Sequence, residues 1–384
     1  MRLYGLPLVI AMLWMPGVLT PAVAQQAGAA PKAQAHEIVL PVSVSNKRGD
    51  PVPNLSASDF TLTDNRKEQS IASFAPGSSV PLQVGILVDT SRGMKRSLDA
   101  ERKAAASFVD LILPAEGSGE KNGNRVFLLH FDKEVELIED FTDSRSKLKN
   151  DLQEMTPTPE GEKSEGPETT DSGNGKQPKM RGEGADLYDA IYLASHEVMK
   201  SARGRKVLVV FSQGSDLGSR ERINDAIDAA ERANTVVYTI YFRGDEENLR
   251  MGRGGVGNGM PPLYPGGYPG GYPGGYPGGY PYPDTYPGGG GGGSGMPKVN
   301  GKNNLADIAT RTGGRIFEAK HIDAVTGIYH EIADELQGQY LLTYAPNPLD
   351  ADGTFHKTEL TAKKSGLIVN VPEGYYAPGG DSQQ

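Results

Sequence analysis

Oxygen-bearing side chains follow the first buried apolar run of the sequence. Residues 84–88 read Val-Gly-Ile-Leu-Val, and Asp89 and Ser91 come directly after them. A continuous apolar run of this length is typical of a strand buried on both faces. Ligands of open α/β sheets bind at the carboxyl ends of such strands. A carboxylate and a hydroxyl in one loop can hold a hard cation or place a serine nucleophile beside an acid. Asp89 and Ser91 are therefore the first candidate site.

Other catalytic motifs in the chain lack the context that they need. Residues 252–257 have the glycine spacing of a dinucleotide-binding loop, but prolines follow at once and no helix can begin there. Two His-Glu pairs, at His196 and His330, begin a zinc-protease motif without its second histidine. A hydrolase of another type would depend on Ser91 and Asp89 alone, with no histidine in the segments expected around them. We therefore expect no enzyme.

The elements that position this loop are strands alternating with helices. Apolar residues recur at helical spacing between the apolar runs, for example from residue 98 to residue 112. Strands separated by helices of this length predict an α/β fold with a doubly wound, mainly parallel sheet covered on both faces. We expect this domain to span residues 82–338. Its expected strands cover residues 84–88, 126–131, 135–138, 207–211, 236–242 and 316–317.

Two β segments flank this domain. Apolar and polar residues alternate within residues 36–80 and again within residues 339–378, as in strands with one buried face. Neither segment is large enough to fold well alone. We therefore expect the N- and C-terminal segments to pair into one small β layer beside the α/β domain.

Two insertions interrupt the α/β pattern. Residues 156–181 are polar and rich in Glu, Gly and Pro, and residues 252–295 are rich in Gly, Tyr and Pro. Such segments cannot bury enough apolar surface to offset their ordering entropy. The second insertion repeats Tyr-Pro-Gly-Gly and offers a candidate binding tract, because tyrosine combines a large contact area with a polar tip. A passive spacer is the other interpretation. The repeat tyrosines are Tyr264, Tyr268, Tyr272, Tyr276 and Tyr280.

Composition and the N-terminal segment indicate which kinds of partner and which cellular compartment to expect. The formal net charge is −9 with no block of Lys or Arg, so the long-range field repels phosphate backbones and nucleic acid is not expected. The first 24 residues combine Arg2, a mostly apolar run over residues 6–19 and Ala22-Val23-Ala24, as in a cleaved signal peptide. We expect a secreted or periplasmic protein with no transmembrane anchor after cleavage. The chain has no cysteine, so packing alone must hold it together.

An ordered set of motifs resembles one family. Asp89-Thr90-Ser91 after a buried strand and before a helix resembles the start of a von Willebrand factor type A domain. The flanking segments resemble the secreted bacterial VWFA-related proteins. The segments that carry this resemblance are residues 49–52, 55, 59–65, 187–190, 339–344 and 374–378.

The resemblance implies a metal site that has lost several ligands. Type A domains characteristically bind a divalent cation through Asp-x-Ser-x-Ser, a Thr from a second loop and an Asp from a third. Asp89 and Ser91 match this pattern, and Asp186 is a candidate substitute ligand. We expect no cofactor, with Mg²⁺ binding weak or lost, because Mg²⁺ needs near-ideal oxygen coordination. The degenerate positions are Gly93, Ala185 and Gln213.

These expectations define a function. They indicate an exported, non-enzymatic module that binds a protein or a cell-envelope component through the face that holds Asp89, Ser91 and Gln213. Both insertions are expected to emerge near that face. The alternative is a structural or adhesive surface protein that self-associates through its Tyr/Pro/Gly-rich tract.

Overall fold

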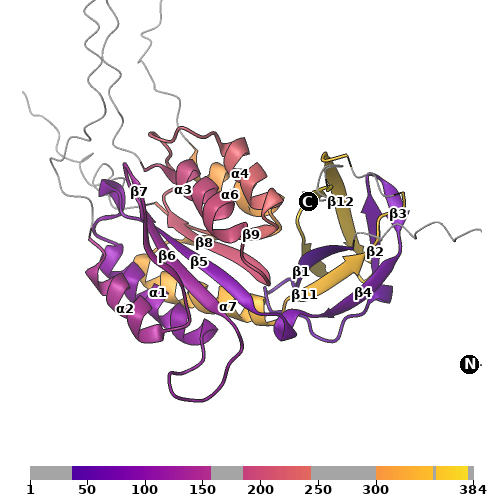
Figure 1. The fold of residues 1–384 in the computed structure, drawn as a ribbon, viewed down its shortest axis with the longest axis horizontal. Helices are drawn as coiled ribbons and strands as arrows, with labels where there is room; N and C mark the ends of the chain where they lie inside the picture. Colours follow the sequence, from indigo (N-terminus) through magenta and orange to yellow (C-terminus); the bar gives the residue numbers. More distant parts are fainter. Residues whose placement is uncertain (1–36, 157–184, 244–299, 349–351, 379–384) are drawn as a thin grey trace, which may run out of the picture. The chain divides into compact units, whose positions relative to one another are not determined.

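The computed structural model describes residues 37–156, 185–243, 300–348 and 352–378 (Figure 1). The expected signal segment, nearly all of the first insertion and the whole second insertion with its repeat tyrosines lie outside these ranges. None of the helices in the described ranges has the length and apolar character that crossing a membrane requires.

A six-stranded sheet forms the centre of the α/β domain. Its order is β10-β9-β8-β5-β6-β7, with β7 antiparallel to β6 and every other pair parallel. All residues of the central strand β5 are buried, as its apolar run predicts. The predicted mainly parallel sheet is thus confirmed. Its strands are β5 (Leu82–Asp89), β6 (Arg125–Phe131), β7 (Val135–Thr142), β8 (Arg205–Ser212), β9 (Thr235–Phe242) and β10 (Ile316–Ala319).

Helices cover both faces of this sheet (Figure 1). One face packs against α1 (Leu98–Ile112), α2 (Arg145–Glu154) and α7 (Val325–Gln337). The other face packs against α3 (Leu187–Leu193), α4 (Ile223–Arg232) and α6 (Gly301–Arg311). A π-helical turn over Ala194–Met199 continues α3.

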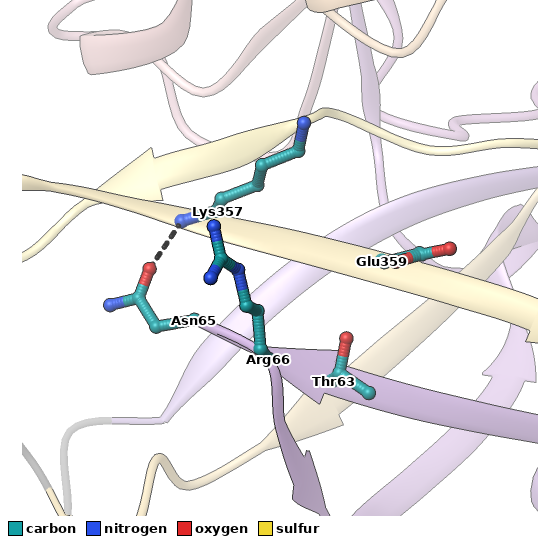
Figure 2. Close-up of a pocket in the computed structure, with 5 residues that line it drawn as sticks. All are labelled: Thr63, Asn65, Arg66, Lys357 and Glu359. Atoms are coloured by element: carbon teal, nitrogen blue, oxygen red, sulfur yellow. Dashed lines mark hydrogen bonds between the residues drawn. The ribbon is translucent and has the colours of Figure 1, made fainter.

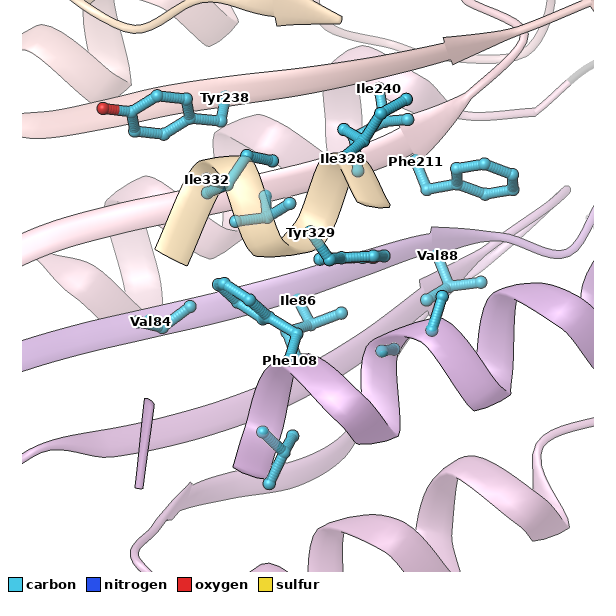
Figure 3. Packing of buried hydrophobic residues seen from close by; sticks show 14 of the residues in the cluster. Val84, Ile86, Val88, Phe108, Phe211, Tyr238, Ile240, Ile328, Tyr329 and Ile332 are labelled. Carbon is cyan, nitrogen blue, oxygen red and sulfur yellow. The ribbon is translucent and has the colours of Figure 1, made fainter. Parts of the chain in front are cut away.

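The core on the first face is closely packed and contains one carboxyl group. Figure 3 shows the Phe108 ring of α1 between Val84 and Ile86 of β5, with Tyr329 of α7 above it; the ring centroids of Phe108 and Tyr329 are 5.0 Å apart. Glu101 of α1 accepts a hydrogen bond from the Tyr329 hydroxyl in this core. Burial raises the pKa of Glu101 to about 8, and the other carboxyl oxygen of Glu101 has no partner within the described residues.

The N- and C-terminal β segments pair with each other, as predicted. They form two four-stranded antiparallel sheets, ordered β13-β1-β11-β4 and β14-β12-β2-β3, rather than a single layer. Both sheets have one apolar face, and these faces share a single core, so two sheets bury more apolar surface than one could. We call this unit the β module. Its strands are β1 (Ile38–Asn46), β2 (Phe60–Asp64), β3 (Lys67–Gln69), β4 (Ile71–Pro76), β11 (Tyr340–Tyr344), β12 (Phe355–Ala362), β13 (Leu367–Asn370) and β14 (Gly374–Tyr376).

A buried carboxylate joins the two sheets of the β module. The Tyr344 and Tyr375 hydroxyls donate to the same Asp64 oxygen at 3.0 and 2.9 Å, and His356 Nδ1 lies 3.5 Å from the other oxygen. Each of these four residues is less than 9% exposed. Asp64, Tyr344 and Tyr375 all belong to segments that carry the family resemblance. In the structure these three residues have a shared structural role, because their hydrogen bonds join the two sheets.

Candidate functional site

Three loops meet at the carboxyl edge of the parallel strands. The loop after β5 contains Asp89 and Ser91, the loop after β6 contains Asp132, and the loop after β8 begins at Ser212 and Gln213. Because β5, β6 and β8 run parallel and pair directly, their carboxyl ends lie at one edge of the sheet. The structure therefore brings Asp89 and Gln213 to the same edge, as the sequence predicts.

Hydrogen bonds to both carboxylate oxygens fix the Asp89 side chain. Its side chain is fully buried, and its two carboxylate oxygens accept from the Ser91 backbone N–H at 3.0 Å and from Ser212 Oγ at 2.6 Å. Ser212 Oγ in turn accepts from the Gly214 N–H at 2.9 Å. Burial raises the pKa of the Asp89 carboxyl, the charge of Asp132 acts in the same direction, and the Ser212 and Ser91 hydroxyls oppose the shift. Asp89 thus stabilises the junction between the β5 and β8 loops.

The Ser91 side chain takes little part in this network. It is 1% exposed, and its Oγ, although near enough to Asp89 to lower the carboxyl pKa, makes no hydrogen bond of acceptable geometry with the described residues. Among the residues that the structure describes, no histidine hydrogen-bonds to Ser91 Oγ.

Gly93 and Gln213 fit together. A Cβ built on Gly93 would lie 2.8 Å from Gln213 Nε2 and 2.9 Å from Oε1, closer than real Cβ atoms approach such groups. The carboxamide of Gln213 therefore occupies the space into which a serine at position 93 would extend. The two substitutions that the sequence shows separately are one packing arrangement in the structure.

Ala185 and Asp186 connect the other two loops. The Asp186 N–H donates to the Asp132 carbonyl at 2.6 Å, and Ala185 forms an isolated parallel bridge with Asp216 in the loop after β8. Ala185 is fully buried and brings no side-chain oxygen to the edge. The Asp186 carboxylate lies against Gly218, because Oδ1 is 1.9 Å from the position that a Cβ there would take.

The fold and these loops are those of a known family. Residues 84–215 match the family model of the von Willebrand factor type A domain. The chain contains a type A domain. This confirms the resemblance that Asp89 and Ser91 suggest from sequence.

The solved structures to which the chain is similar have low sequence identity and TM-scores below 0.5. Proximal thread matrix protein 1 of the mussel byssus is 11% identical with a TM-score of 0.43, and the match covers 71% of this chain and 50% of that one. The chain thus spans about half the length of the mussel protein. BatB of Bacteroides thetaiotaomicron is 14% identical with a TM-score of 0.37, covering 66% of this chain and 98% of that one. No curated protein matches the chain in sequence.

The oxygen donors of this type A domain do not form an evident metal site. Within the described ranges no three His, Cys, Asp or Glu side chains are grouped so that they could hold a metal ion. Both Asp89 oxygens already accept hydrogen bonds, and the Gln213 amide is packed over Gly93. A divalent cation needs several converging oxygens to offset its dehydration, and the residues present do not fit that requirement.

The residues that follow both insertions contact this edge of the type A domain. Ala185, after the first insertion, bridges to Asp216. Gly301, after the second, packs so closely on the Gln213–Gly214 backbone that a Cβ there would lie 2.4 Å from the Gln213 carbonyl oxygen. The described residues that follow each insertion thus lie at this edge, whereas the insertions, which the sequence analysis expects near it, lie outside the described residues.

Sequence reasoning missed several residues of this edge. Ser212 holds Asp89, and Asp216 accepts from Ser219 Oγ at 2.6 Å and from the Tyr188 N–H at 3.2 Å, which fixes the loop after β8 onto α3. That loop presents Leu217, which is 50% exposed. A leucine in a polar loop, one residue after Asp216, was the available signal in the sequence.

Proposed function

We propose that the chain is a non-enzymatic protein-binding module that recognises its partner through the carboxyl edge of the type A domain. The contact surface is formed by Arg92, Gln213 and Leu217, which we call the carboxyl-edge surface. Exposed Leu217, on a loop that its neighbours fix in place, is the observation that carries this proposal. An apolar side chain held on a rigid loop loses little entropy on binding and can fill a partner pocket.

Contacts on three sides support the rigidity of this surface. The Leu217 N–H donates to the Ala185 carbonyl at 3.4 Å, and the preceding Asp216 is bonded to Ser219 and to Tyr188. From the other side, the Asp189 carboxylate accepts from the Arg220 and Glu221 N–H groups at 2.8 to 3.1 Å. The loop is therefore anchored before and after Leu217.

Binding through this surface does not use a bridging cation in our proposal. The degenerate positions Gly93, Ala185 and Gln213 carry no carboxylate or hydroxyl oxygen, and Asp186 is directed at Gly218. Type A domains generally act as interaction modules, and here direct side-chain contact takes the place of metal coordination.

The proposal places the protein outside the cytoplasm, with a protein or cell-envelope component as its partner. The apolar segment ending at Ala24 supports export. Mass spectrometry of exported material should find Gln25 as the first residue, whereas an intact Met1 on exported protein would contradict this part of the proposal.

A pair of leucine variants tests the carboxyl-edge surface. Leu217→Asp and Leu111→Asp introduce the same charge at exposed leucines, but Leu111 lies near the C-terminal end of α1, at the opposite edge of the sheet. Each purified protein is immobilised and incubated with native cell-envelope extract, which serves as the probe. The extract proteins that each variant retains are then quantified. We expect wild type and Leu111→Asp to retain the same proteins and Leu217→Asp to lose them. Equal retention by Leu217→Asp, or none by wild type, would refute the surface.

The alternative function, self-association through the Tyr/Pro/Gly-rich tract, depends on residues outside the described ranges. Deletion of residues 252–295 separates the two functions. The alternative requires this deletion to abolish oligomers in light scattering, whereas our proposal requires that Leu217→Asp reduces partner retention even in the deleted chain.

A further inference from the structure

A polar groove lies on the β module. It has a volume of about 490 Å³ and is lined by Thr63 of β2, Asn65 and Arg66 of the β2–β3 turn, and Lys357 and Glu359 of β12. Figure 2 shows the Arg66 guanidinium next to the Lys357 backbone, the Lys357 side chain extending onward from β12, and Thr63 and Glu359 further along the two strands. The groove therefore has a cationic end and an end with a hydroxyl and a carboxylate.

The backbone at the cationic end is strained and firmly held. Asn65 and Arg66 form a two-residue hairpin turn with φ of 46° and 67°. Turns with positive φ at both central positions strongly favour glycine at the second, because a Cβ there is crowded. Asn65 tolerates this conformation and ties the turn to β12, donating its N–H to the Lys357 carbonyl at 2.8 Å and accepting the Lys357 N–H at 3.0 Å. Arginine at position 66 costs stability, which favours a role for its side chain.

Within the described ranges, neither cation of the groove has an ion-pair partner. Among the residues that the structure describes, no carboxylate lies within ion-pair distance of the Arg66 guanidinium or the Lys357 ammonium, and neither group makes a side-chain hydrogen bond. The chain as a whole carries a net charge of −9, so two adjacent unpaired cations form a local exception. A guanidinium binds a carboxylate through two parallel hydrogen bonds, and a neighbouring ammonium adds charge without demanding geometry.

The groove adjoins a second groove. Lys357 and Glu359 also line a second groove of about 490 Å³, whose other walls come from residues 310–316 between α6 and β10 and from residues 369–373. The two grooves meet at β12, where the exposed Lys357 and Glu359 line both of them. This length suits an extended polypeptide better than a single small anion.

We propose that this groove binds a carboxylate carried by an extended polypeptide segment, with Arg66 and Lys357 holding the carboxylate. Thr63 and Glu359 then face donors further along the same segment. The site is independent of the carboxyl-edge surface, so either can fail without the other.

Arg66→Gly provides a test in which loss of folding cannot imitate loss of binding. Asn-Gly is the preferred pair for this turn, so the variant should melt at the same or a higher temperature than wild type. The probe is a fluorescently labelled hexaglutamate peptide, followed by anisotropy at low salt with the full-length protein. We expect affinity to fall at least tenfold in Arg66→Gly and in Lys357→Gln, and to stay within twofold of wild type in the control Lys103→Gln, which removes an exposed cation from α1.

Three results would overturn the proposal. The first is no binding of hexaglutamate by wild type, and the second is equal affinity in Arg66→Gly. The third is displacement of the peptide by inorganic phosphate at concentrations similar to that of the peptide itself, which would make the groove a site for small anions.

Discussion

Gln213 lies so close over Gly93 that a Cβ at position 93 would be 2.8 Å from Nε2 and 2.9 Å from Oε1 of its carboxamide. The relationship links two loops that are 120 residues apart in the chain, one after β5 and one after β8. It means that the two positions pack against each other, so a side chain at position 93 requires the Gln213 carboxamide to shift.

Gly93→Ser should destabilise the protein because the new side chain meets the Gln213 amide. The Gln213 carboxamide is the end of a flexible, half-buried side chain and can turn aside, so we expect a loss of under ~1 kcal/mol in the free energy of unfolding, measured by urea denaturation. In a Gln213→Ala background the space is open, and the same serine should cost at least ~0.5 kcal/mol less, as expected for residues in direct contact. Additive effects of the two substitutions would show that the contact carries no energy.

Divalent cations should not stabilise the folded state. Because Asp89 already accepts two hydrogen bonds and three ligand positions lack their usual oxygens, millimolar Mg²⁺ or EDTA should leave the melting temperature unchanged, since only a ligand that binds the native state stabilises it. Calorimetry with Mg²⁺, Mn²⁺ and Ca²⁺ on wild type and Asp89→Ala is the direct test. Micromolar binding that disappears in Asp89→Ala would contradict the degenerate site and indicate Asp186 or Gln213 as replacement ligands.

Glu101 should make stability fall as the pH rises. Burial raises its pKa from 4.5 to about 8 in the folded protein. Between these values the unfolded chain has lost the proton that the folded protein keeps, so wild type loses up to ~1.4 kcal/mol per pH unit. Glu101→Gln cannot ionise and should remove this slope. Urea denaturation from pH 5 to pH 8 measures it.

The difference between Glu101→Gln and wild type isolates this group, because Glu231, whose pKa burial raises to about 7, contributes a slope of the same sign in both proteins. Parallel pH curves for Glu101→Gln and wild type would mean that the carboxyl ionises normally inside the core.

Arg205 should hold together the two ends of the type A domain. Its buried guanidinium donates through Nη1 to the Leu336 carbonyl at 2.6 Å and through Nε to the Val80 carbonyl at 3.2 Å, joining the segments that enter and leave the domain. Arg205→Met removes both donors and should cost ~2 kcal/mol or more in the free energy of unfolding. Arg203→Met, at an exposed position two residues earlier, is the matched control and should change stability little.

Local patterns were sufficient to predict the elements of this protein and their class. The apolar run of β5 predicts a strand buried on both faces because a parallel sheet removes both faces from water. Alternation in β2 and β12 likewise predicts strands with one buried face. Because the family motifs lie at loops whose positions follow from this order, Asp89 and Gln213 could be placed at the same edge from sequence alone.

The contacts at that edge were decided by the tertiary structure. No local pattern indicates that Ser212 holds Asp89, that Gln213 fills the space above Gly93, or that Arg66 and Lys357 share a groove, because each pair joins residues more than a hundred positions apart. The arrangement of the β module as two sheets was also decided by the tertiary structure. Alternation shows that each strand has an apolar face, but which apolar faces cover one another depends on the packing of the whole chain, which excludes water from all of them at once.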